Sequence, residues 1–555
     1  MARKIKDYRI APDEIFLDDS NLPSLDTNQF EGRIERPISK LSLYSAGIVF
    51  SFIAIFFLGR VGYLQVVQGR QYADRSKNNS LRQTVILPSR GIIYDRNGVE
   101  LAWNKPERTY IDLPGFSNLD GYMGFPNDDE VAGTSTFADK EQVGRAGIEK
   151  QFNDFLTGTK GLRVEEVNVK GEVVSESSLK QAGSGQAVNL SIDSRLETKL
   201  FETIKSVVED RGFGGGSGVI INVKTGELLA LTSFPEFDSN IMTSHSDSAA
   251  ITGFFTNPKK PFLDRAVSGL YAPGSIFKPI VALGALTEHT VDPLKQIFSS
   301  GQLEIPNPYN PKEKTIFKDW EAHGWIDMRH AIAESSDEYF YQIGGGYPGQ
   351  TGLGIANIEK YANLFGLARP TGVELPNEAT GVIPSPQWKA ATFNGEPWRL
   401  GDTYHTAIGQ YGVQVTPLQM ARVAAAIANE GTLLKPTILK WTSSTTPAGE
   451  KLPIAKGSFD IVHEGMRLGV TSGRGTGHGL DVGFVNIASK TGTAELGVSK
   501  ARVNSWVMGF WPYENPKYAF IVSMESGART NTIGGVFVMR TMFDWMEGNL
   551  PEYLK

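Results

Sequence analysis

A serine and a lysine three positions apart give the first sign of chemistry in this chain. In the segment YAPGSIFKPIVALGAL, Ser275 and Lys278 follow the turn-forming pair Pro273-Gly274 and begin a stretch with helical periodicity. Residues three apart on a helix share one face. A serine at the start of a helix lies beside free backbone N–H groups, and a neutral lysine one turn further on can accept its proton. The pattern predicts a serine nucleophile with a lysine base.

A lysine can act as such a base only if its surroundings lower its pKa. An ordinary lysine has a pKa of about 10.4, so to act as a base at pH 7 its pKa must fall by about three, which costs about 4 kcal/mol. Burial or a nearby cation can produce this change. We expect Lys490, in the segment SKTGTAEL, to be that cation.

The strand-like segment SKTGTAEL also suits the binding of a carboxylate. The ammonium of Lys490 and the hydroxyls of Thr491 and Thr493 match the carboxylate at the end of a peptide. The N–H of Thr493, together with that of Ser275, could form an oxyanion hole. Gly492 has no side chain, so we expect the backbone of a substrate to approach closely there.

A third motif lies between these two in the sequence. In AESSDEYFY, Ser335 and Asp337 are two positions apart. We expect this pair to relay a proton to a leaving amine and to hold the amide of a substrate. The chain then has a nucleophile, a base, a relay and an anchor, which is a complete set for acyl transfer.

Each motif taken singly is a weak signal, because the chain contains similar ones elsewhere. Ser177 and Lys180 have the same spacing but no turn before them and no apolar helix after them. A second K-T-G begins at Lys224, in the turn of a predicted hairpin, and the following Glu227 would repel a carboxylate. We interpret both as structural.

One apolar segment is long enough to reach across a membrane. Residues 41–58 carry no charge and are bracketed by Lys40 and Arg60, with Tyr44 and Tyr63 at interfacial positions. The polar leader before it is too long for a signal peptide, and no A-x-A site follows closely. We predict an uncleaved anchor, with a buried globular helix as the alternative. Basic residues lie on both sides, so charge does not decide the orientation.

Composition excludes several other classes of protein. The 555 residues carry a net charge of −6, which gives no reason to expect nucleic-acid binding. The absence of cysteine rules out disulfides and thiolate chemistry, and the histidines show no metal-ligand spacing. We therefore expect no metal site and no cofactor.

The pattern outside the anchor predicts an α+β protein. Asn97-Gly98 lies between two apolar stretches, as in a β-hairpin, and residues 120–136 are polar and Gly-rich, as in an insertion or a surface loop. Strands are predicted at 218–223, 227–233, 503–510 and 518–525, and a closing helix at 536–546. This layout is an antiparallel sheet with helices packed on it.

The three motifs occur in the order found in the penicillin-recognising serine enzymes. With the segments PSRGIIYDRNGVELA, GRAGIEKQFNDFLTGTKG, NVKTGELLALTSFPEFDSN and GDTYHTAIGQYGVQVTPLQMA, they resemble the class B penicillin-binding proteins from about residue 41 to 548. The stretch SSDEYFYQIG and the GIEK region are similar to the elongation-type rather than the division-type members. Asp337 stands where much of the wider superfamily has asparagine.

The resemblance implies a D,D-transpeptidase that cross-links the stem peptides of peptidoglycan through a serine acyl-enzyme and is acylated by β-lactams. It implies a single-pass protein of the inner membrane with its catalytic part on the outer, periplasmic side. Implied partners are a SEDS-family glycosyltransferase and other membrane proteins of the elongation complex. The implied divisions are a cytoplasmic tail (1–40), an anchor (41–64), a β-rich pedestal module (65–215) and a transpeptidase domain (216–548).

Other functions fit the same motifs. A D,D-carboxypeptidase, which uses water in place of the amine, would need the same residues. A non-catalytic β-lactam sensor or scaffold would keep the fold without turnover. A β-lactamase fits less well, because such enzymes are usually short soluble domains without an anchor or an extra module.

Overall fold

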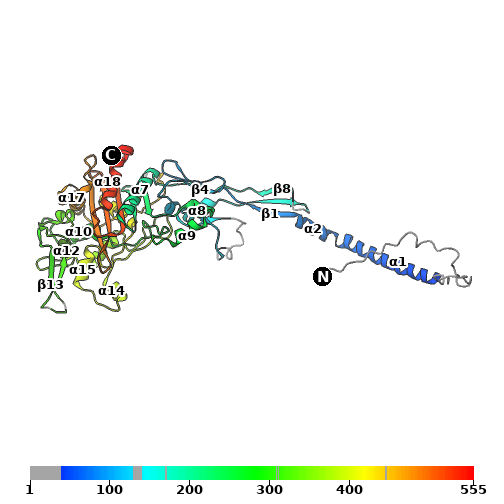
Figure 1. Ribbon diagram of the computed structural model, residues 1–555, viewed down its shortest axis with the longest axis horizontal. Helices are drawn as coiled ribbons and strands as arrows, with labels where there is room; N and C mark the ends of the chain where they lie inside the picture. Colours follow the sequence, from blue (N-terminus) through cyan, green and yellow to red (C-terminus); the bar gives the residue numbers. More distant parts are fainter. Residues whose placement is uncertain are drawn as a thin grey trace, which may run out of the picture. The chain divides into compact units, whose positions relative to one another are not determined.

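The computed structural model describes residues 39–128, 130, 141–168, 172–307, 309–310, 312–443 and 447–555. The predicted cytoplasmic tail therefore lies outside the described residues, apart from its last two positions. The chain forms two compact units, one made of residues 1–84 and 164–177 and the other of residues 85–163 and 178–555. They are drawn in Figure 1.

The first unit contains the predicted membrane helix. Helix α1 (Lys40–Gly62) continues through a π-helical turn, η3 (Tyr63–Val67), and none of its residues is buried. The helix over residues 40–67 is long and apolar enough to cross a membrane. Helix α2 (Gly69–Ser80) follows. Strand β1 (Leu81–Ile86) then begins a three-stranded sheet in the order β1-β7-β8, with β7 (Gly161–Val167) and β8 (Val173–Lys180).

The second unit begins with a small sheet in the order β4-β3-β2-β9. The hairpin predicted at Asn97-Gly98 joins β2 to β3 in antiparallel pairing, and Gly98 has a φ of 87°. Arg90 and Arg108 both contact the buried carboxylate of Glu149, at 2.6 and 2.5 Å. The strands are β2 (Ile93–Tyr94), β3 (Glu100–Asn104), β4 (Arg108–Tyr110) and β9 (Val188–Asn189).

The prediction of a surface loop at residues 120–136 was wrong for its first part. Asp120 is 1% exposed, and Met123–Gly124 forms a strand, β5, that pairs with β6 (Val143–Gly144). The reason is that the apolar Met123 side chain and this strand pairing hold the segment in the interior. Residues 129 and 131–136 lie outside the described part of the chain.

A five-stranded antiparallel sheet forms the centre of the second unit, in the order β11-β10-β20-β19-β18. The four strands and the closing helix predicted from apolar patterns are all present. In sequence order the elements are β10 (Gly215–Asn222), β11 (Leu228–Phe234), β18 (Ala488–Leu496), β19 (Arg502–Trp511), β20 (Tyr518–Ala528) and α18 (Gly535–Asn549).

Helices cover both faces of this sheet because the strand side chains alternate between two apolar cores. Ile220 and Val507 face α7 (Ser194–Arg211) and α18, which lie side by side over the sheet in Figure 1. Val219 and Met508 belong to the core on the opposite side, which holds the central helices. These include α10 (Lys278–Thr287), α11 (Met328–Ala333), α12 (Asp337–Gly345), α16 (Pro417–Ala428) and α17 (Lys456–Thr471).

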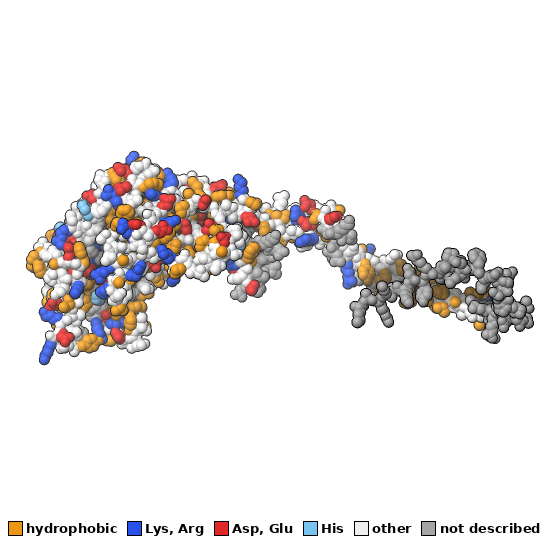
Figure 2. Space-filling view, viewed as in Figure 1, with side chains coloured by type: hydrophobic (Ala, Val, Ile, Leu, Met, Phe, Trp, Pro, Cys, Tyr) orange, Lys and Arg blue, Asp and Glu red, His pale blue; other side chains and the backbone are white. Residues whose placement is uncertain are grey.

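The remaining elements are short and lie around this framework. On the face shown in Figure 2, acidic and basic side chains of the second unit are interspersed. The other helices are α3 (Ser117–Asp120), α5 (Gly147–Gln151), α6 (Asn153–Thr157), α8 (Ser239–Ser244), α9 (Ser248–Thr256), α13 (Ile355–Leu364), α14 (Pro386–Thr392) and α15 (Leu400–Ala407). Three two-stranded sheets pair β12 (Ile297–Ser299) with β15 (Gly324–Ile326), β13 (Gln302–Pro306) with β14 (Lys314–Lys318), and β16 (Thr432–Leu433) with β17 (Glu450–Lys451).

Candidate active site

Ser275 lies in a tight turn that is fixed from several sides. The turn is a 3-10 helix, η4 (Gly274–Phe277), and runs directly into α10. The N–H of Gly274 donates to the carbonyl of Gly409 at 3.0 Å, and the indole N–H of Trp506 donates to the carbonyl of Ala272 at 3.0 Å. Ser275 itself is partly exposed.

Lys278 is the most constrained residue of the predicted set. Its side chain is fully buried, and its Nζ donates to Asp337 Oδ1 at 2.6 Å and to the carbonyl of Ser335 at 2.7 Å. The Oγ of Ser335 lies 3.3 Å from the same ammonium. A buried ammonium needs such partners, because an unpaired charge in the interior is very costly. The structure thus joins the first motif directly to the second.

The second motif lies at the junction of two helices, which explains its geometry. Helix α11 ends at Ala333, and Ser336 caps the N-terminus of α12 by accepting a hydrogen bond from the N–H of Tyr339. Between them Ser335 has a φ of 63°, a left-handed conformation that is uncommon for residues other than glycine. Such strained residues are held in place by their surroundings and concentrate at functional sites. Here the reversal of the chain places the Ser335 carbonyl against Lys278.

The third motif lies on the edge strand β18, which packs against the turn that carries Ser275. A Cβ on Gly274 would come within 2.8 Å of the carbonyl oxygen of Thr493. A Cβ on Gly492 would come within 2.8 Å of the carbonyl oxygen of Pro273. The structure therefore gives a different reason for Gly492 from the one we expected. It admits the turn that carries Ser275, and the expected approach of a substrate backbone stays a prediction.

The charge of Lys278 also reaches the third motif. Lys490 is 1% exposed, and its Nζ donates to the carbonyl of Thr491 at 2.9 Å. Burial, reinforced by the positive charge of Lys278, holds the pKa of Lys490 well below its usual range, while Asp337 opposes the change. Thr491 is half-buried and Thr493 is exposed. A carboxylate that entered this site would restore the preference of Lys490 for its charged form.

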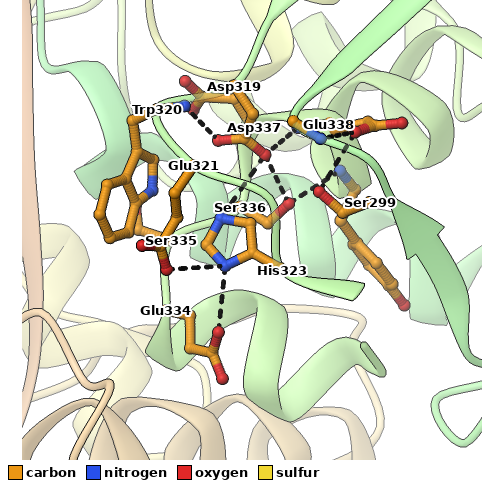
Figure 3. A network of polar contacts seen from close by, with 12 residues as sticks. Ser299, Asp319, Trp320, Glu321, His323, Glu334, Ser335, Ser336, Asp337 and Glu338 are labelled. Carbon is orange, nitrogen blue, oxygen red and sulfur yellow. Dashed lines mark hydrogen bonds and ion pairs between the residues drawn. The ribbon is translucent and has the colours of Figure 1, made fainter. Parts of the chain in front are cut away.

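A polar network that the sequence did not predict supports the second motif (Figure 3). The buried carboxylate of Asp319, between β14 and β15, accepts hydrogen bonds of 2.8 Å from the Ser336 hydroxyl and from the N–H groups of Glu338 and Trp320. Nδ1 of His323 lies 3.0 Å from Glu334 Oε2, and its Nε2 lies 3.6 Å from Asp319 Oδ2. Asp319 and His323 thus connect the residues on either side of Ser335.

The electrostatics of this network favour an ion pair between Asp319 and His323. Burial opposes ionisation of Asp319, but His323, the charge of Lys278 and backbone N–H donors outweigh it and lower the pKa of Asp319 to about 2. Burial also disfavours a charged His323, yet the carboxylates of Asp319 and Glu334 raise the pKa of this imidazole above its usual value.

One group of side chains in the network has the composition of a metal site. Glu321, His323 and Glu334 each place one ligand atom within 4.8 Å of the others. A cation already lies among them, since the guanidinium of Arg474 is 2.8 Å from Glu321 and 3.1 Å from Glu334. Spacing in the sequence did not predict this group, because the loop between β14 and β15, helix α11 and the loop after α17 bring it together only in the fold.

The two similar motifs elsewhere in the chain differ from this site in their local structure. Ser177 and Lys180 lie in the exposed strand β8, without a helix behind them. Lys224 lies in the turn between β10 and β11, where the hydroxyl of Thr225 donates to Glu227 at 2.9 Å. Neither segment has the buried lysine that accompanies Ser275.

The fold and this arrangement of motifs define the penicillin-binding protein class. A family model described as "Penicillin binding protein transpeptidase domain" matches residues 216–537, more than half of the chain, and one described as "Penicillin-binding Protein dimerisation domain" matches residues 104–190. The chain therefore belongs to the penicillin-binding protein transpeptidase family.

Its relatives narrow the class further. "Peptidoglycan D,D-transpeptidase MrdA" of Haemophilus influenzae is 25% identical, with 93% of each chain covered. The protein of the same name from Acinetobacter baumannii is 28% identical, with 87% of this chain and 84% of the relative covered. Among solved structures, penicillin-binding protein 2 (PBP2) of Pseudomonas aeruginosa in complex with WCK 5153 superposes with a TM-score of 0.71, at 29% identity, with 85% and 98% covered. The chain is thus similar to PBP2, also called MrdA.

Proposed function

We propose that this chain is a peptidoglycan D,D-transpeptidase of the elongation type and that it forms a serine acyl-enzyme through Ser275. The observation that carries the proposal is the buried Lys278 ammonium. It is held at 2.7 Å from the Ser335 carbonyl and 2.6 Å from Asp337, at the start of the helix that follows Ser275. A lysine buried in this way is poised to exchange a proton with a neighbouring hydroxyl.

In the proposed acylation, the Lys278 ammonium first passes a proton to the Asp337 carboxylate, which lies 2.6 Å away. The Oγ of Ser275 then attacks the carbonyl of the penultimate D-alanine of a stem peptide, and its proton passes to the neutral amine of Lys278. The N–H groups of Ser275 and Thr493 stabilise the oxyanion that develops. Ser335 relays the proton to the departing terminal D-alanine, and an ester to Ser275 remains. An amine from a second stem peptide then attacks this ester, which forms the cross-link and returns the proton to Ser275.

Substrate binding in this proposal falls to Asp337 and the third motif. Asp337 holds the substrate amide, while Lys490, Thr491 and Thr493 bind the terminal carboxylate. Burial lowers the pKa of Lys490, and a bound carboxylate would raise it again. A buried lysine without a carboxylate partner gains most from a ligand that supplies one. Gly492 contributes by letting β18 lie against the catalytic turn. A β-lactam, which also carries a carboxylate and a reactive carbonyl, would acylate Ser275 in the same way.

The proposal extends to the arrangement of the chain in the cell. Helix α1 serves as a single-pass anchor in the inner membrane, and the catalytic part lies on the outer, periplasmic side, where its substrate is found. In this proposal the chain divides into a tail (1–40), an anchor (41–64), a pedestal (65–215) and a transpeptidase domain (216–548).

The proposed partners are a SEDS-family glycosyltransferase and other membrane proteins of the elongation complex. Two similar structures support assemblies of this kind. One, at 26% identity and a TM-score of 0.71, is entitled "Structural coordination of polymerization and crosslinking by a peptidoglycan synthase complex". The other is PBP2 of Helicobacter pylori in complex with MreC.

The reaction can be tested with the purified full-length protein, a stem pentapeptide donor and an added amine acceptor. The proposal predicts a new amide that joins donor to acceptor, with release of D-alanine, detected by mass spectrometry. Ser275→Ala should form none. Release of D-alanine with only the hydrolysed donor would identify a D,D-carboxypeptidase, and no turnover by a folded sample that still binds penicillin would identify a sensor.

A further inference from the structure

The loop Ser472–Gly477, which follows α17, lies between the second and third motifs. The hydroxyl of Thr491 contacts the hydroxyl of Thr476 at 2.6 Å. On its other side, Thr476 donates its backbone N–H to the carbonyl of Ala333 at 3.1 Å, and its hydroxyl lies 3.4 Å from the same oxygen. Ala333 is two residues before Ser335. One threonine thus connects both motifs.

The loop is held firmly enough to fix this side chain. The N–H of Gly477 donates to the carbonyl of Gly469 at 2.9 Å, and a Cβ on Gly477 would come within 2.3 Å of the Ser489 hydroxyl on β18. Arg474 pairs with Glu321 and Glu334, at 2.8 and 3.1 Å. Because Arg474 and Gly477 are held on either side of it, Thr476 has little freedom to move away from Thr491.

We infer that Thr476 is a positioning residue that holds the Thr491 hydroxyl ready for the carboxylate of a ligand. Without a ligand, Thr491 donates its hydrogen to Thr476, whose own hydrogen points toward the Ala333 carbonyl. When a carboxylate enters, Thr491 must donate to it. The Thr476 hydroxyl can then turn from its long contact with Ala333 and donate to Thr491. Thr476 itself touches no substrate atom in this scheme.

This inference rests on the proposed function, because it assumes that Thr491 binds a carboxylate. It makes a prediction that a purely structural role would not make. Loss of the Thr476 hydroxyl should slow the reaction with ligands that carry a free carboxylate and should leave ligands with a blocked carboxylate much less affected.

The test compares acylation of the full-length protein by benzylpenicillin and by its methyl ester. For Thr476→Val, which keeps the shape but removes the hydroxyl, we expect the rate with the free acid to fall about tenfold, equivalent to about 1.4 kcal/mol. The rate with the ester should change less than about twofold, and Thr476→Ser should restore the free-acid rate. Thr471→Val is a matched control. Thr471 is exposed at the end of α17, just before this loop, and its hydroxyl donates to the Arg467 carbonyl.

The ratio of the two rates does not depend on the fraction of protein that is folded. An equal fall with both probes, or an unchanged ratio in Thr476→Val, would overturn the inference while the proposed function stands. A wild-type protein that neither probe acylates would overturn the proposed function, and the inference with it.

Discussion

Replacement of Asp319 by asparagine should weaken the second motif in a predictable, pH-dependent way. The Asp319 carboxylate accepts hydrogen bonds from the Ser336 hydroxyl and from the N–H groups of Glu338 and Trp320, all at 2.8 Å, and its side chain is buried. Asparagine keeps one acceptor oxygen but turns an NH₂ group toward donors. At least one of the three donors is then left without its partner, and loss of the part-buried bond from Ser336 or Glu338 costs roughly 1–3 kcal/mol.

The pKa of Asp319 gives a second magnitude, which partly reflects the same hydrogen bonds. It is lowered from 3.8 to about 2. A difference of this size corresponds to about 2.5 kcal/mol of stability for the ionised form. Because folding lowers the pKa of this carboxyl, the stabilisation is complete above about pH 4 and is lost as the pH falls toward 2. We therefore expect Asp319→Asn to reduce the free energy of unfolding by about 2–4 kcal/mol at pH 7.

The assay is thermal unfolding of the full-length protein in detergent at about pH 7, 4 and 2.5, followed by fluorescence, together with acylation by a labelled penicillin at about pH 7. Asp327→Asn is a suitable control, because Asp327 caps α11 and asparagine caps helices about as well. The difference between wild type and Asp319→Asn should shrink between about pH 4 and 2.5. A variant that melts and acylates like wild type, or a difference independent of pH, would refute this explanation of the second motif.

Three further substitutions test other parts of the site. Ser275→Ala should abolish acylation without lowering the melting temperature, since Ser275 is partly exposed. Lys490→Met should slow acylation by the free acid of penicillin at least about tenfold. It should raise the melting temperature or leave it unchanged, because burial holds the pKa of Lys490 low and the charged form is costly to bury. A large loss of stability would contradict this prediction. In the wild type, folding raises the pKa of the His323 imidazole. The loss of stability in His323→Gln should therefore be largest below about pH 6.5 and shrink as the pH rises above the folded pKa. Melting temperatures between about pH 6 and 9 measure this difference, and a loss that grows with pH would count against the ion pair of His323.

Much of this fold could be predicted from local patterns. The strands at 218–223 and 503–510 are predictable because each is a short apolar run bounded by turn residues. The long apolar helix at residues 40–67 is predictable because an uncharged segment of this length is typical of a membrane-spanning helix. Residues 120–124 were mispredicted because the polar and glycine content of the wider segment outweighed the signal from one buried methionine, Met123.

The candidate site could be predicted from the sequence only for residues that belong to short motifs. Ser275 and Lys278 are neighbours on one helical turn, so spacing alone relates them. Asp319, His323 and Thr476 carry no such pattern, since their roles depend on loops that meet Ser336, Glu334 and Thr491 only after folding. The reason for Gly492 was also beyond the sequence, because the close neighbour of this glycine is Pro273, more than two hundred residues earlier. An alignment of motifs cannot supply contacts of this kind.

Ser275 is the proposed site of the acyl-enzyme. The decisive experiment is incubation of the full-length protein with a fluorescent penicillin, followed by denaturing electrophoresis and peptide mapping. We predict one labelled peptide, the one that contains Ser275, and no label in Ser275→Ala. A label on another residue, or a folded wild-type protein that takes up none, would contradict the account.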